Sequence, residues 1–107
     1  MDEINKDISL EEEARSQDAS QERLRELAAL NGDLAEIVAS NVSAPPELLT
    51  ELANHESKVV RKAVTSNPNT PTETLFKLGE YFPQEFLNNP VFELLILENS
   101  NFLNNIP

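Results

Sequence analysis

Residues 44–69 read APPELLTELANHESKVVRKAVTSNPN and contain two apolar patterns of helical spacing, one on each side of a turn. Leu49 and Leu52 lie three residues apart, so they share one face of a first helix. Ser57 is a favourable N-cap residue for a second helix. The apolar residues of that second helix follow at helical spacing, at Val60, Ala63 and Val64. The stretch therefore predicts two short helices, each with one face that must be buried.

The same pattern recurs on both sides of this stretch, as in helical repeat proteins. The three units span residues 19–43, 44–69 and 70–101. Their first helices share a pair of leucines, at Leu24/Leu27, Leu49/Leu52 and Leu75/Leu78. Their second helices share an apolar triplet, at Leu34/Ile37/Val38, Val60/Ala63/Val64 and Phe92/Leu95/Ile96. Because one helix pair cannot bury its own apolar stripe, we expect the units to stack around a shared core.

Capping residues and prolines predict where the helices begin and end. Thr70 and Glu73 are spaced as a capping box around Pro71, which favours the start of a first helix there. The second helices are predicted to begin at Asn31, Ser57 and Asn89. They are predicted to end at Asn41, Asn67 and Asn99, where asparagine can adopt a left-handed conformation. Residues 81–88 (YFPQEFLN) are interpreted as an extra turn inserted between the two helices of the third unit.

The chain is predicted to contain one all-α domain that follows an acidic leader. Residues 1–18, which include Glu11–Glu13, are expected to be solvated and disordered. Residues 19–107 form the helical repeat domain, which ends in the sequence NFLNNIP. This ending is similar to the start of another first helix. Either the chain is a fragment of a longer protein, or the ending is a tail that caps the stack.

Composition and charge exclude several classes of function. The chain has no cysteine, which excludes disulfides and thiolate metal sites. It has no apolar run long enough to cross a bilayer, and its acidic N-terminus is unlike a signal peptide, so a cytoplasmic location is predicted. The net charge of −11 repels phosphate groups and anionic membranes. We therefore expect neither a nucleic acid nor a membrane as a partner.

No residue pattern predicts catalysis or a cofactor. His55 is the single histidine, and it lies in a predicted turn without a neighbouring nucleophile or a second metal ligand. No spacing singles out two carboxylates in an apolar setting, and phosphate-binding loops, GxSxG motifs and calcium loops are absent from the sequence. We therefore expect no enzyme activity, no catalytic residue, no metal, no cofactor and no small-molecule ligand.

Lys58, Arg61 and Lys62 form a basic cluster at the start of the second helix of the middle unit. Their spacing of three and four residues places them together on the exposed side of that helix. In one interpretation they are a solvated helix surface. In the other they bind an acidic segment, which belongs either to a partner protein or to this chain's own Glu11–Glu13. They are the candidate partner-binding residues.

The sequence VVRKAVTSNPNTPTETLFKLGE (residues 59–80), with its weaker echo LAEIVASNVSAPPELLTELA (residues 34–53), resembles the leucine-rich repeat variant family of bacterial proteins. The resemblance extends over residues 19–101. It implies a short right-handed superhelix whose units combine an α-helix with a shorter, often 3₁₀-like helix. It also implies an interaction scaffold. Some members carry a cysteine-rich domain that binds an iron-sulfur centre, and this cysteine-free chain departs from them.

The repeat and the lack of a chemical site together favour a non-catalytic scaffold or adaptor domain that binds another protein. The alternative is a structural or regulatory appendage of a larger, multidomain bacterial protein.

Overall fold

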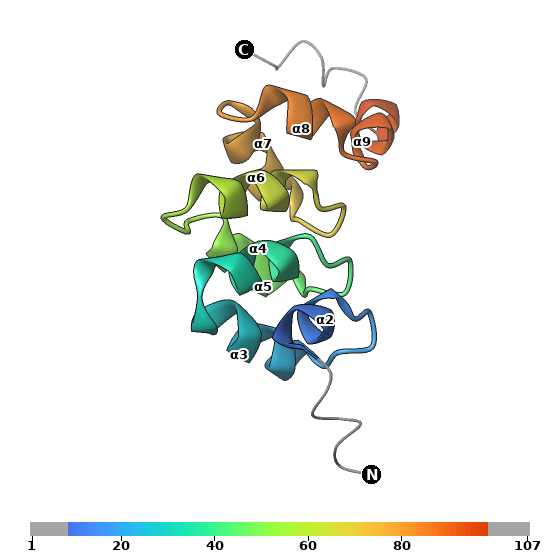
Figure 1. Ribbon diagram of the computed structural model, residues 1–107. Coiled ribbons are helices and arrows are strands. Elements are labelled where there is room, and N and C mark those ends of the chain that lie inside the picture. Colours follow the sequence, from blue (N-terminus) through green and yellow to red (C-terminus); the bar gives the residue numbers. More distant parts are fainter. Residues whose placement is uncertain (1–8, 99–107) are drawn as a thin grey trace.

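The computed structural model describes residues 9–98, which contain eight α-helices joined by short turns (Figure 1). They are α2 (Leu10–Arg15), α3 (Gln21–Leu30), α4 (Gly32–Ala39), α5 (Pro46–Leu52), α6 (Lys58–Ser66), α7 (Thr72–Gly79), α8 (Pro83–Asn88) and α9 (Phe92–Glu98). These described residues contain neither a strand nor a 3₁₀ helix. The predicted all-α fold class is confirmed. The predicted helix end at Asn99 and the NFLNNIP ending lie outside the described residues.

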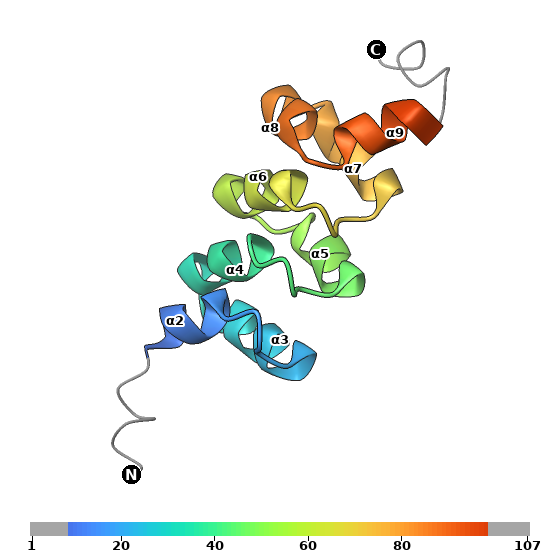
Figure 2. The same ribbon diagram turned by 90° about the vertical axis from the view of Figure 1, so that its right-hand side faces the viewer.

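The helices lie in successive layers along the long axis of the molecule. Figures 1 and 2 show α2 and α3 at one end, α4, α5 and α6 in the middle, and α7, α8 and α9 at the other end. The principal extents are 57 × 26 × 20 Å. The helices α2, α4, α6 and α8 each belong to one of four successive layers: α4 contacts α2 and α6, and α6 contacts α8. Each layer thus packs on its neighbours in sequence, as in a solenoid.

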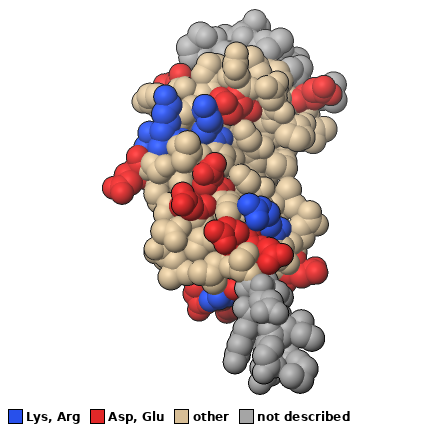
Figure 3. All heavy atoms as spheres, in the orientation of Figure 1, with Lys and Arg blue, Asp and Glu red and all other residues tan. Residues whose placement is uncertain are grey.

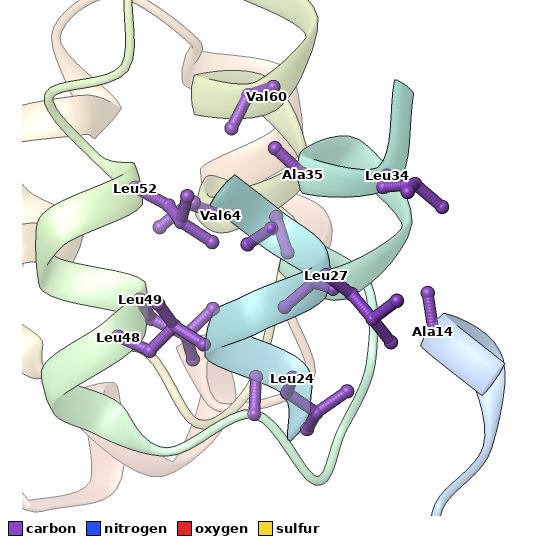
Figure 4. Packing of buried hydrophobic residues seen from close by; sticks show 14 of the residues in the cluster. Ala14, Leu24, Leu27, Leu34, Ala35, Leu48, Leu49, Leu52, Val60 and Val64 are labelled. Carbon is purple, nitrogen blue, oxygen red and sulfur yellow. The ribbon is translucent and has the colours of Figure 1, made fainter. Parts of the chain in front are cut away.

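Leucine and valine side chains at the predicted positions form the core between the layers. The predicted leucine pairs of α3, α5 and α7 are all buried, at Leu24, Leu27, Leu49, Leu52, Leu75 and Leu78. Figure 4 shows part of this packing around α3. The main cluster extends from Ala14 in α2 to Phe82 beyond α7, and a smaller cluster at Leu75 and Phe86 extends toward α9. Burying one large apolar side chain stabilises the fold by roughly 1.5–3 kcal/mol.

Side-chain caps fix the starts of the first three described helices. Ser20 accepts a hydrogen bond from the backbone of α3, and Asn31 accepts one from α4, as predicted for Asn31. Ser9 caps α2 in a reciprocal capping box: the Glu12 N–H donates to the Ser9 hydroxyl at 3.1 Å, and the Ser9 N–H donates to the Glu12 carboxylate at 3.1 Å. These bonds satisfy backbone groups that have no partner within the helix.

The predicted capping box at Thr70 and Glu73 is wrong. Helix α7 begins at Thr72 and has no side-chain cap. The Thr70 hydroxyl is buried and donates instead to the Val64 carbonyl oxygen at 2.7 Å, at the end of α6. A proline at the N-cap position, Pro71, sets an extended backbone that leads into the helix. The hydroxyl therefore connects two layers and does not start a helix.

Three buried asparagines, Asn41, Asn67 and Asn89, connect successive layers and are called here the asparagine ladder. In each, the side-chain N–H₂ group donates to two carbonyl oxygens of the preceding layer. Those bonds are Asn41 to Ala14 (2.8 Å) and Ser16 (2.8 Å), Asn67 to Ala39 (2.8 Å) and Asn41 (2.9 Å), and Asn89 to Thr65 (2.9 Å) and Asn67 (3.0 Å). Each side-chain oxygen accepts from the N–H two residues further on, at 2.8–3.0 Å. All hydrogen-bonding groups of these carboxamides are therefore satisfied.

The ladder also corrects the reason given for helix termination at asparagine. Within residues 9–98, no residue of any type has a positive φ. Asn67 ends α6 in an extended conformation, with φ −85° and ψ 125°. Asparagine is used at these positions because one short side chain can accept a hydrogen bond locally and donate two across the interface.

The assignment of Asn89 as the start of a second helix is wrong. Asn89 follows α8 and makes the ladder bonds that Asn41 and Asn67 make after α4 and α6. The supposed insertion, residues 81–88, therefore contains the second helix of the third unit, and α9 takes the position of a following first helix. A proline marks the observed start of the second helix, because Pro83 is the first residue of α8.

The leader prediction is wrong for residues 10–15, which form α2. Ala14 in this helix is fully buried in the main core cluster, and α2 contacts α3 and α4. Only one alanine of α2 is buried, so the segment has no apolar pattern that could distinguish it from a solvated acidic stretch. Residues 1–8 of the predicted leader lie outside the described part of the chain.

Candidate functional site

A groove of about 620 Å³ lies where the end of α5, the start of α6 and α7 meet. Ala53, Leu78 and Phe82 contribute apolar lining to this groove. Uncharged polar groups come from Thr50, Asn54 and Thr74, and Tyr81 stands beside them with 74% of its surface exposed. The volume falls within the range of about 300–1,000 Å³ that is usual for ligand sites. The groove draws on two successive units, so neither unit alone could form it.

Three basic side chains line the groove: Lys58 and Arg61 from α6, and Lys77 from α7. Figure 3 shows blue side chains gathered over the layers of α6 and α7, with red side chains beside them and below them. The basic cluster predicted from the sequence contains Lys58 and Arg61 but misses Lys77, which lies in another unit. Sequence spacing within one helix carries no signal for a residue that stacking brings close.

Arg61 has a local structural role in addition to its place in the groove. Its guanidinium donates to the carbonyl oxygens of His55 at 2.7 Å and Glu56 at 3.3 Å. The His55 ring contributes as well, because its Nδ1 accepts a hydrogen bond from the Ser57 N–H at 2.9 Å. These three bonds fix the turn between α5 and α6, which sets the position of Lys58 at the groove.

Lys62, the third member of the predicted cluster, is not among the residues that line the groove. Its ammonium group lies 3.8 Å from the carboxylate of Glu85 on α8. An exposed pair at this distance contributes about 0–1 kcal/mol to stability. The predicted cluster is therefore divided: Lys58 and Arg61 line the groove, and Lys62 forms an ion pair with the next layer.

The acidic segment Glu11–Glu13 lies at the opposite end of the stack from α7, in α2 (Figure 1). The Glu13 carboxylate accepts from Arg23 at 2.8 and 3.1 Å and so joins α2 to α3. This hydrogen bonding holds the pKa of Glu13 below its usual value, although burial acts in the opposite direction. The hypothesis that the basic cluster binds this segment of the same chain is therefore contradicted by the fold.

A second hollow of about 610 Å³ lies between α2 and α4 and has an acidic lining that includes Glu11, Asp33 and Glu36. Across residues 9–98, no three His, Asp or Glu side chains are grouped so that they could hold a metal ion. In the same part of the chain, no helix is long and apolar enough to cross a membrane.

Stacked helix pairs with a shared core and a regular hydrogen-bond ladder define an α-helical repeat protein. Residues 9–66, from the N-cap of α2 to the last residue of α6, match the Leucine Rich Repeat Variant domain. This match covers more than half of the chain, and the chain belongs to that family. The predicted family is confirmed, and the match includes α2, which the sequence interpretation had placed in the leader. The comparisons with curated proteins and with solved structures found no match.

Proposed function

We propose that this chain is a non-catalytic protein-interaction module that holds a segment of a partner protein in the groove between α5, α6 and α7. The observation that carries the proposal is the lining of this groove, in which apolar, hydrogen-bonding and basic side chains from two units converge. Grooves along helical repeats form extended binding surfaces for other macromolecules. Membership of a repeat family supports an interaction module in general, and the groove supplies the particular surface.

Photo-crosslinking tests the proposal at the level of single positions. A photoreactive phenylalanine derivative would replace Tyr81 beside the groove or, as a control, Leu30 on α3, which is also exposed. After illumination in lysate of the source organism, we expect defined protein adducts from position 81 that position 30 does not give. No adduct from either position, or the same set from both, would contradict a binding surface at the groove.

The second candidate, a structural or regulatory appendage of a larger protein, is favoured by the surface at Leu87. Leu87 stands two residues before Asn89, as Thr65 stands before Asn67. Thr65 is fully buried, whereas Leu87 is 52% exposed. In this alternative another part of the same larger protein covers Leu87. A photoreactive residue at position 87 of the protein in its natural length would then give an intramolecular crosslink, and the absence of one would remove this candidate.

A further inference from the structure

The groove concentrates positive charge on a chain that carries 19 acidic and 8 basic residues. Its charged lining consists of Lys58, Arg61, Lys77 and Glu80. Of the other described basic side chains, three form ion pairs, namely Arg23 with Glu13 and Glu26, Arg25 with Glu51, and Lys62 with Glu85, while Arg15 forms none and lies in α2, outside the groove. Lys58 and Lys77 have no such partner within residues 9–98. Two lysines are therefore available to an anionic ligand at the groove.

The first turn of α6 departs from the charge pattern of the other described helices. Each of the other seven has at least one Asp or Glu in its first turn, which complements the partial positive charge at a helix N-terminus. Helix α6 has none: it begins with Lys58, and its N-cap Ser57 makes no side-chain hydrogen bond to it. Lysine at this end destabilises a helix. A carboxylate bound beside Lys58 would offset that effect.

The rest of the lining suits an extended peptide. The Thr74 hydroxyl and the Asn54 amide can donate to and accept from a peptide backbone, and the Thr50 hydroxyl, which donates to the Pro46 carbonyl oxygen, can accept from it. Leu78 and Phe82 are buried at the edge of the groove, so Ala53 and Tyr81 provide the apolar surface for a side chain between two charged ones. From this combination, and resting on the function proposed above, we propose that the groove selects an extended acidic segment of the partner protein. Its carboxylates pair with Lys58 and Lys77, and Tyr81 packs beside the segment.

Two other anionic occupants are disfavoured by charge and position. A nucleic acid would carry its phosphates over a molecule with a net charge of −11, whose acidic side chains lie close to the basic ones (Figure 3). The chain's own Glu11–Glu13 is held in α2 through the bonds between Glu13 and Arg23. A short acidic segment of another protein brings fewer charges and needs no movement of α2.

An array of labelled peptides tests this inference. The peptides would carry Glu and Asp at varied spacings around one aromatic residue, and each would have a counterpart with Gln and Asn in place of the acids. We expect acidic peptides to bind the wild-type chain more tightly than their amide counterparts, and this preference to weaken as salt is added. Lys58→Glu and Lys77→Glu should each weaken binding by about fivefold or more at low salt.

Two controls separate a binding site from general electrostatics and from unfolding. Arg15→Glu makes the same change in net charge at an exposed base outside the groove, so it should leave peptide affinity within about twofold of wild type. Lys58→Glu adds an acid to the first turn of α6, so its Tm should equal or exceed that of wild type while its affinity falls. Lys77→Glu should behave as Lys58→Glu does in affinity.

The inference is overturned if no acidic peptide binds more tightly than its amide counterpart, or if Arg15→Glu weakens binding as much as Lys58→Glu does. A lower Tm for Lys58→Glu would also count against it, because that lysine would then have a structural role. Crosslinks from position 81 to a partner region without acidic residues would refute the acidic specificity and leave the interaction module standing. The absence of crosslinks from position 81 would refute the interaction module itself.

Discussion

Replacing Asn67 by alanine should remove three hydrogen bonds, two of them buried and one partly buried, from the middle of the asparagine ladder. The Asn67 side chain is 2% exposed, donates to Ala39 and Asn41 at 2.8 and 2.9 Å, and accepts from Asn69 at 2.8 Å. At about 1 kcal/mol net for each bond, the loss is about 3 kcal/mol. A domain of this size has a total stability of about 5–15 kcal/mol. The expected fall in Tm is about 12–24 °C.

Thermal and urea denaturation, followed by circular dichroism, would measure this loss against matched variants. Asn54→Ala makes the same substitution at an exposed turn residue and should change stability by less than about 0.5 kcal/mol. Asn67→Asp keeps the shape of the side chain but places a carboxylate oxygen against two carbonyl oxygens. At neutral pH it should therefore destabilise the fold at least as much as Asn67→Ala does. The reasoning fails if Asn67→Ala and Asn54→Ala have the same stability within error.

Three further predictions concern the glycines and the pair between α2 and α3. Gly79→Ala should destabilise by about 1–3 kcal/mol in urea denaturation, because its Cβ would lie 3.0 Å from the Phe86 ring. Gly32→Ala, which meets nothing within 4 Å, should instead stabilise by about 0.5–1 kcal/mol, and equal effects at the two sites would contradict this contrast. Arg23→Ala should raise the pKa of Glu13 toward its usual value, measured by an NMR titration of the carboxyl group. Because the pKa of Glu13 is lowered in the folded state, the ion pair stabilises the fold at neutral pH. This stabilisation is lost as the pH falls through the folded-state pKa of Glu13. In acid, wild type and Arg23→Ala should therefore have similar free energies of unfolding.

The sequence predicted the first helices well and the ends of the stack poorly. Leucine pairs such as Leu24 and Leu27 identify a buried helix face because their spacing has the helical period. The same logic fails for α2, whose contribution to the core is only Ala14, and for α8, which is a short helix with Phe86 as its buried residue. A short helix with one buried side chain has no period to detect, so tertiary packing alone decides its state.

Only those groove residues that lie on the same helix could be predicted from the sequence. Lys58 and Arg61 are near one another in sequence and on one helix, so spacing brought them together. Lys77 lies at the groove only because α7 stacks on the layer before it. Lys62 does not line the groove, and its ammonium group lies within ion-pair distance of Glu85 on α8. The buried roles of Asn41 and Asn67 were also missed. Asparagine is usually exposed, and its recurrence at the helix ends was explained by backbone conformation alone.

The asparagine ladder has a direction along the chain, which bears on the order of assembly during translation. Each ladder asparagine donates to carbonyl groups that lie 22 to 28 residues earlier, so the ribosome releases the acceptors before the donor. Synthesis at about 5–20 residues per second leaves seconds between one donor and the next, whereas helices form in microseconds or less. The Ser16 carbonyl oxygen accepts from Asn41, and the Ser16 hydroxyl accepts from the Asp18 N–H, but Ser16 has no side-chain amide that could donate to an earlier layer. Within residues 9–98 the ladder therefore begins at Ser16, and each later layer can dock on one that is already complete.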